Sequence, residues 1–336
     1  MRNSLWRQPL DWLPTQINYT GAMGKRLAAH FDVPLSQVPA RLDNHLLRLD
    51  LTHSRRLSTD GNISYDWWGA GWDTQTEGYW HAFAPLAAAP DLADFPWPDP
   101  LEPGLLDDAA DALAQDGDEH FSAPNLGMCL FERAWSLRGF DVLLMDLVDR
   151  PGWVEELLER ITVIQVNLAK RFVALGVDGG YFGDDYGAQR WMLFSPTTWR
   201  RLFKPRLARM FTVFRDAGLP VILHSDGDIW AILPDLVDIG LTALNPVQPE
   251  VLDHTRLQRE FGRDLAFYGG ISTQTVLPAG TAAQVQEATA ACMRTLAPGG
   301  TGLILGPSHR MQSDIPIENV EAMRGAFPRS MPIAQI

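Results

Sequence analysis

The second half of the chain repeats one pattern of apolar and polar positions five times. Each repeat has a short apolar segment, then a cluster of polar residues, then a stretch with the spacing of an amphipathic helix. The apolar segments are at 179–183, 220–223, 241–244, 265–268 and 301–306, and the helical patterns are at 196–218, 228–240, 253–263, 281–296 and 317–327. Short strands that alternate with helices of this length are typical of βα units on a parallel sheet.

The first half is less regular, and it predicts three further strands. These lie at 14–19, 45–51 and 121–126, with helices over 104–115 and 155–174. Three strands and five strands make eight, so we expect an α/β fold, a (β/α)8 TIM barrel, that spans 1–336 as one domain. The alternative is a doubly wound open sheet, but no GxGxxG follows any early strand.

Residues 64–83 interrupt this alternation with a run of aromatic side chains around three glycines. The aromatic residues are Tyr65, Trp67, Trp68, Trp72, Tyr79, Trp80 and Phe83. Their density predicts an inserted Trp-rich β-hairpin that serves as a lid or a dimer surface.

Composition narrows the function classes. The chain has 336 residues, a net charge of −13 and scattered basic residues, which argues against a nucleic-acid partner. Two distant cysteines, Cys129 and Cys292, argue against a disulfide scaffold or a cysteine-rich zinc module and fit a reducing cytoplasm. No apolar run approaches the roughly 18 residues that a membrane helix needs, and the N-terminus lacks the apolar region of a secretory signal. We therefore expect a cytoplasmic protein without a membrane partner.

In such a barrel the active site lies at the C-terminal ends of the strands, where the polar clusters fall. Residues that are distant in sequence should therefore converge there. The converging set is Gln16, Asn18, Asp184, Asp185, Tyr186, His224, Asp226, Asn245, Gln248, Ser308 and His309. We expect Gln16, Asn18, Tyr186, Asn245, Gln248 and Ser308 to bind substrate, and Asp184, Asp185, His224 and His309 to be catalytic.

Several roles stay open at this point. Two adjacent acids, Asp184 and Asp185, do not easily face one pocket together, and the sequence does not say which one does. His224 and Asp226 are spaced to offer an imidazole and a carboxylate to one divalent metal. Asp226 could equally orient a catalytic histidine or cap the following helix. His309 follows a Gly-Pro-Ser turn, which displays a side chain.

Arginines are candidates for binding a carboxylate or phosphate of a ligand, because the guanidinium fork pairs bidentately with both. Arg138, Arg190 and Arg310 are the residues considered for this role.

Four motifs together resemble the uroporphyrinogen decarboxylase superfamily, in its methyltransferase-like and uncharacterised branches. They are Gly183-Asp-Asp-Tyr-Gly187, His224-Ser-Asp-Gly227, Leu244-Asn-Pro-Val-Gln-Pro249 and Pro307-Ser-His309. The resemblance covers nearly the whole chain and implies a (β/α)8 barrel with a cleft at the strand ends. It also implies a homodimer, since members of the family often dimerise.

Two chemistries compete within that superfamily. The decarboxylases use no cofactor, and they hold substrate carboxylates with arginines near the first strand. Residues 14–23 contain no arginine here, although His309 lies where the decarboxylases carry a C-terminal histidine. Methyltransferases that activate a thiol hold zinc through a His-x-Cys pair and a later cysteine. This chain keeps His224 but has Asp226 and the pair Ser308-His309 at the cysteine positions.

The resemblance therefore implies zinc held by His224, Asp226 and His309, where it would act as a Lewis acid. It favours a corrinoid-linked methyltransferase or demethylase that acts on a small methylated substrate and passes the methyl group to a corrinoid protein. The second hypothesis is a cofactor-free decarboxylase of a porphyrinogen or a smaller carboxylated substrate, with His309 and Asp184 as proton donors or anchors. The third is a barrel that binds a ligand without catalysis.

Overall fold

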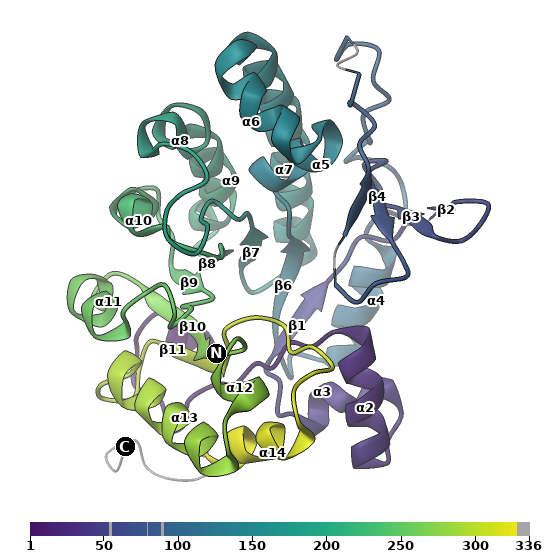
Figure 1. The fold of residues 1–336 in the computed structure, drawn as a ribbon. Coiled ribbons are helices and arrows are strands. Elements are labelled where there is room, and N and C mark those ends of the chain that lie inside the picture. The colour runs from purple at the N-terminus through teal and green to yellow at the C-terminus, as the bar shows by residue number, and fades with distance from the viewer. Residues whose placement is uncertain (54–55, 79, 89–90, 328–336) are drawn as a thin grey trace.

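The computed structural model describes residues 1–53, 56–78, 80–88 and 91–327. Within these residues a seven-stranded parallel sheet curls into a half-barrel with strand order β1-β6-β7-β8-β9-β10-β11 (Figure 1). The strands are β1 (Leu46–Leu49), β6 (Phe121–Leu126), β7 (Gly180–Gly183), β8 (Val221–His224), β9 (Ala243–Asn245), β10 (Ala266–Ile271) and β11 (Leu303–Pro307). The predicted α/β class and parallel sheet are therefore confirmed.

The helices of the described residues mostly surround the sheet on its outer side, while α1 (Arg2–Leu5) places Leu5 inside it (Figure 1). They are α1 (Arg2–Leu5), α2 (Gly21–Phe31), η1 (Leu35–Gln37), α3 (Val38–Arg41), α4 (Asp107–Asp116), α5 (Phe131–Arg138), α6 (Phe140–Asp149), α7 (Pro151–Leu175), α8 (Pro196–Leu202), α9 (Lys204–Asp216), η2 (Trp230–Ile232), α10 (Leu233–Asp238), α11 (His254–Phe261), α12 (Val276–Ala279), α13 (Ala282–Leu296) and α14 (Ile317–Gly325). No helix in the described part of the chain is long and apolar enough to cross a membrane.

Two predicted helices are interrupted in the structure. The pattern at 196–218 forms α8 and α9 with a break at Phe203, because Pro205 at the start of α9 has no N–H to continue the first helix. The pattern at 228–240 forms η2 and then α10, whose first turn contains Pro234. A proline within a helical pattern thus begins a new helix in both cases.

The predicted strand at 14–19 is not a regular strand, so the count of eight strands is corrected to seven and an extended segment. Gln16 N donates to Leu305 O at 2.9 Å on one side, and His45 N donates to Thr15 O at 3.1 Å on the other. The Asn44 side chain exchanges two hydrogen bonds with the backbone of Ile17, at 2.7 and 3.0 Å. The Asn44 side chain thus supplies hydrogen bonds that a neighbouring backbone would make in a regular strand. The segment at 14–19 nevertheless connects β11 with the chain that leads into β1.

The predicted hairpin at 64–83 is not confirmed in that form. The described residues form a four-stranded antiparallel sheet with order β2-β3-β4-β5. Its strands are β2 (Arg56–Leu57), β3 (Ile63–Tyr65), β4 (Gly71–Asp73) and β5 (His81–Phe83), and Tyr79 lies outside the described residues. The sheet packs on α5, where the ring centroids of Trp72 and Trp135 are 6.1 Å apart and His81 Nε2 is 2.7 Å from Ser136 O.

The inside of the barrel changes from apolar to polar along its axis. Apolar side chains fill the part that lies away from the C-terminal ends of the strands. One buried cluster there consists of Leu5, Leu46, Phe121, Ala123, Tyr181, Ile222, Ala243, Ala266, Tyr268 and Ile304. Leu5 comes from α1, whose Ser4 Oγ donates to Leu303 O at 2.8 Å. Polar residues begin where the strands end, at His224 and Asn245, so this end offers polar groups to a ligand.

The contact between the closing segment and β11 predicts a strong effect of one methyl group. A Cβ at Gly306 would lie 2.1 Å from Gln16 O, so Gly306→Ala must separate the two backbones. We expect a loss of about 1–3 kcal/mol in the free energy of unfolding, measured by urea unfolding and circular dichroism. Gly152→Ala on α7, where a Cβ meets no atom within 4 Å, is the control and should be neutral or slightly stabilising. Equal unfolding midpoints for both variants would contradict this closure.

Candidate functional site

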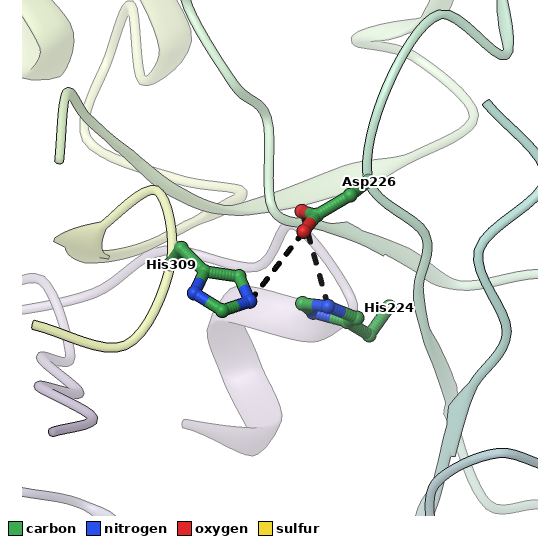
Figure 2. A group of neighbouring side chains, drawn as sticks. All are labelled: His224, Asp226 and His309. Atoms are coloured by element: carbon green, nitrogen blue, oxygen red, sulfur yellow. Dashed lines mark ion pairs between the residues drawn. The ribbon is translucent and has the colours of Figure 1, made fainter. Parts of the chain in front are cut away.

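His224, Asp226 and His309 meet at the C-terminal ends of the strands (Figure 2). His224 ends β8, Asp226 follows it by two residues, and His309 comes from the loop after β11. Asp226 Oδ2 is 3.4 Å from His309 Nε2, and Asp226 Oδ1 is 3.9 Å from His224 Nε2. Among the described residues, these three offer one ligand atom each within 4.8 Å of one another. The predicted convergence of these three residues is thus present in the structure.

The imidazole of His224 is held by a buried amide. His224 Nδ1 is 2.7 Å from Asn245 Oδ1, and Tyr181 donates its hydroxyl to the same oxygen at 2.8 Å. Asn245 Nδ2 donates to Tyr268 O at 3.1 Å, which fixes the amide orientation because a carbonyl only accepts. His224 Nδ1 must therefore donate, and in the neutral ring Nε2 carries the lone pair that faces Asp226. Asn245 is 3% exposed and its amide holds the His224 ring, while its contact with a substrate stays a prediction.

The two adjacent acids have different surroundings. Asp184 is fully buried and accepts hydrogen bonds from Phe131 N at 2.8 Å, from Glu132 N at 2.7 Å and from the Tyr186 hydroxyl. These bonds hold the first amides of α5, which otherwise lack partners. Asp185 retains 34% of its side-chain exposure, and its Oδ1 lies 3.8 Å from His224 Nε2. Asp185 therefore lies partly exposed beside His224, and Asp184 holds the start of α5.

Burial raises the pKa of several carboxyl groups in this region. It raises the pKa of Asp184 and that of Asp185 to about 6. Repulsion from Asp226 acts in the same direction on Asp185, while His224 opposes it. Burial, followed by the charges of Asp185 and Asp184, also holds the pKa of Glu132 well above its usual range. These carboxyl groups can carry protons near neutral pH.

Glu132 also belongs to this cluster, although it was not among the predicted site residues. It lies in the first turn of α5, where an acid is usually a favourable partner of the helix dipole. Its local sequence therefore carries no sign that the residue lies beside Asp185.

Two expected substrate contacts are placed elsewhere. Tyr186 is fully buried among aromatic rings, including Trp199 at 5.8 Å and Phe203 at 5.7 Å between centroids. Gln16 is 4% exposed and accepts from Leu46 N at 3.0 Å in the seam of the sheet. Both side chains thus make contacts within the barrel, and their contact with a substrate stays a prediction. Asn18 points inward and donates to the Tyr268 hydroxyl at 2.9 Å.

A polar cavity of about 270 Å³ adjoins Asp226 and His309, and it contains the other two expected contacts, Gln248 and Ser308. Its lining residues are Gln189, Asp226, Gln248, Thr273, Gln274, Ser308, His309, Arg310, Gln312 and Asp314. Its volume is near the lower end of small-molecule sites, so it suits a small polar ligand. Of the arginines considered above, Arg310 lines this cavity, while Arg138 forms a buried ion pair with Asp146 at 2.7 Å.

Comparisons with known proteins extend these observations. The sequence model of the family described as uroporphyrinogen decarboxylase matches residues 129–329. Comparison with the curated proteins gave no match. Among solved structures, a methyltransferase from Methanosarcina mazei is 19% identical, with a TM-score of 0.71 over 97% of this chain and 96% of that chain. A B12-independent methionine synthase from Shewanella sp. W3-18-1 is 11% identical, with a TM-score of 0.48 over 94% of each chain. At such identities the likeness to the Methanosarcina enzyme shows a shared fold alone.

The different surroundings of the two acids predict opposite effects of the same isosteric change. Asp184→Asn replaces an oxygen acceptor of a helix amide with an NH2 group, so we expect about 1–3 kcal/mol less stability in urea unfolding. Asp185→Asn keeps an acceptor for Asp226 N and removes a charge that Asp226 repels. We expect it to be neutral or stabilising at pH 7. Equal destabilisation by both changes would contradict the assignment.

The stability gained in Asp185→Asn should depend on pH. The native carboxyl has a pKa of about 6 against an ordinary value of 3.8, so the folded state binds more protons between these values. The wild-type residue then loses stability as pH rises through this range. We expect the variant's advantage to be absent near pH 4 and to grow up to about pH 7, in unfolding curves measured at each pH. An advantage that shrinks as pH rises would refute the raised pKa.

Proposed function

Because this chain belongs to the uroporphyrinogen decarboxylase family, we propose that it uses the shared barrel for methyl transfer. In this proposal it removes a methyl group from a small methylated compound and passes it to a corrinoid carried by a partner protein. The observation that carries the proposal is the His224–Asp226–His309 group at the strand ends. The fold shared with a Methanosarcina mazei methyltransferase supports it further. We also propose that residues 1–336 act as one barrel domain, in which the segment at 14–20 takes the place of an eighth strand.

The three side chains fit a zinc ion. Tetrahedral zinc with bonds of 2.0–2.1 Å places its ligand atoms roughly 3.3 Å apart. Asp226 Oδ2 is 3.4 Å from His309 Nε2 and Asp226 Oδ1 is 3.9 Å from His224 Nε2, and one ligand atom from each residue lies within 4.8 Å of the others, so small side-chain rotations would bring the three to that spacing. Two imidazoles and one carboxylate are a usual donor set for a catalytic site, which keeps a fourth position for substrate. When bound, zinc would supply a Lewis acid that polarises an ether or hydroxyl oxygen of the substrate.

The chain's own residues have separate tasks in this reaction. The Asn245 amide holds His224 with Nε2 toward the cleft. An ether oxygen that loses its methyl group gains negative charge and needs a proton. Burial favours the protonated forms of Asp185 and Glu132, because it raises the pKa of Asp185 to about 6 and holds the pKa of Glu132 well above its usual range. We assign the proton transfer to this pair, while Gln248 and Ser308 line the cavity that positions the substrate.

A second candidate function is decarboxylation without a cofactor. The same protonated acids favour it, because a carbanion left by loss of carbon dioxide must be protonated. Arg310 in the cavity supplies a cation for a substrate carboxylate, and His309 lies next to it. The lack of arginines at 14–23 leaves a porphyrinogen with eight carboxylates without its usual partners, so the substrate would be smaller.

Metal content tests the group that carries the proposal. In untagged protein purified without chelators, we expect ~1 zinc per chain, and His224→Ala should reduce it to background. Asn245→Ala keeps all three ligands but frees the imidazole, so we expect about 10- to 100-fold weaker zinc binding in a competition titration. His30→Ala removes a histidine with the same 42% side-chain exposure as His309 and is the matched control. Unchanged zinc in His224→Ala would exclude this site.

The reaction itself is tested with a corrinoid protein and a panel of methyl ethers. We expect the absorption spectrum of the reduced corrinoid to change to that of the methylated form, and His309→Ala to slow this change by about 100-fold or more, as loss of a metal ligand does in metalloenzymes. Release of carbon dioxide from carboxylated substrates, with no methyl transfer, would instead favour the second candidate.

A further inference from the structure

Arg48 brings a cation into the mouth of the barrel. It lies on β1, in register with Ala123 of the inner cluster, so its side chain points inward. Its guanidinium carbon is 4.3 Å from the centroid of the Tyr181 ring. A flat cation above an aromatic face is held in a defined plane. The sequence analysis considered other arginines for ligand binding and missed this one.

The guanidinium of Arg48 has few hydrogen-bond partners among the described residues. Nη2 donates to Asn125 Oδ1, a neutral acceptor, and Nε is buried without a hydrogen bond. Among the described residues no carboxylate lies within 4 Å of Arg48; the nearby acid Asp50 accepts from Asn125 Nδ2 instead, at 2.6 Å. A buried donor without a partner costs roughly 1–3 kcal/mol and calls for an explanation. A ligand oxygen would provide one.

Arg310 lies in the same region, but it comes from the opposite edge of the sheet, beyond β11. It follows His309 in the loop after β11 and lines the cavity with Asp226. The positive charges of Arg48 and Arg310 both lower the pKa of Tyr181 and that of Tyr268, although burial raises both. The two guanidinium groups therefore lie near the same pair of tyrosines.

Arg48 and Arg310, called the cationic side below, lie a short distance from the candidate metal ligands. The Tyr181 ring contacts Arg48, and its hydroxyl donates to the Asn245 oxygen that also holds His224. One ring and two hydrogen bonds thus separate Arg48 from the imidazole.

We propose that Arg48 and Arg310 bind a carboxylate of the substrate, so that the methyl donor is a small methylated carboxylic acid. A planar guanidinium matches a carboxylate with two parallel hydrogen bonds. A cationic methyl donor would instead meet two positively charged guanidinium groups here, which would repel it. The part of this inference that concerns methyl transfer rests on the proposed function; the carboxylate site does not.

Calorimetric titration of the full chain with a matched pair of ligands tests the carboxylate site. The probes are 4-methoxybenzoate and the neutral 4-methoxybenzamide, which have nearly the same shape. We expect the acid to bind at least ~10-fold more tightly, and Arg48→Met or Arg310→Met to weaken only the acid, by about 10- to 100-fold. Arg48→Lys keeps the charge without the fork and should weaken the acid less. Arg160→Met, on the outer helix α7, is the control for removing a cation, and circular dichroism checks that each variant folds.

Each result decides between named alternatives. Equal binding of acid and amide, absence of acid binding, or an acid preference that survives in both Met variants overturns the proposal. Inorganic phosphate that binds as tightly as the acid would make this a general anion site and overturn the carboxylate assignment. Acid-selective binding in a protein without zinc would leave the carboxylate site intact while the methyl-transfer proposal fails. Zinc binding without acid selectivity would overturn the carboxylate site and leave the methyl-transfer proposal intact.

Discussion

Parallel pairing in register is the constraint on which the site depends. In the sheet, Gly183 of β7, His224 of β8 and Asn245 of β9 are paired in one row. Because they are paired, Asn245 and His224 lie at the same level along the strands, and the amide can hydrogen-bond to the imidazole ring. The hydrogen bonds at 14–20 fix the two edges of the sheet, and so bring the loop after β11, with His309, to the same rim. A shift of one residue in any of these pairs would turn a functional side chain toward the outer helices.

The site separates charges that would otherwise cancel. Acids gather at the ends of β7 and β8 and at the start of α5, and burial raises the pKa of Asp184, Asp185 and Glu132 among them. Arginines lie on β1 and after β11, where tyrosine rings and neutral amides surround Arg48. A protein with a net charge of −13 repels anions in general, so a local cationic side is needed for a carboxylate to enter. The two sides thus suit a ligand that is anionic at one end and reactive at the other.

Much of the fold could be predicted from local patterns, and its exceptions have identifiable causes. Strands β7 to β11 were predicted within a few residues, because each is a short apolar run bounded by turns. The helix pattern at 196–218 did not show that Pro205 would divide it. The segment at 14–19 alternates like a strand, but the Asn44 side chain replaces part of its ladder. Such a substitution involves residues about 30 positions apart and leaves no local signal.

The sequence by itself determined the alternation of strands and helices, and with it the edge at which His224, Asp226 and His309 come together. Order along the chain is enough for that result, since parallel strands place all their C-terminal ends on one rim. Only the tertiary structure decided that Asp185 rather than Asp184 lies beside His224, that Asn245 holds this histidine, and that Arg48 contacts Tyr181. Those outcomes depend on which distant groups a side chain meets and on how far each is buried. Neither quantity is a property of neighbouring residues in the sequence.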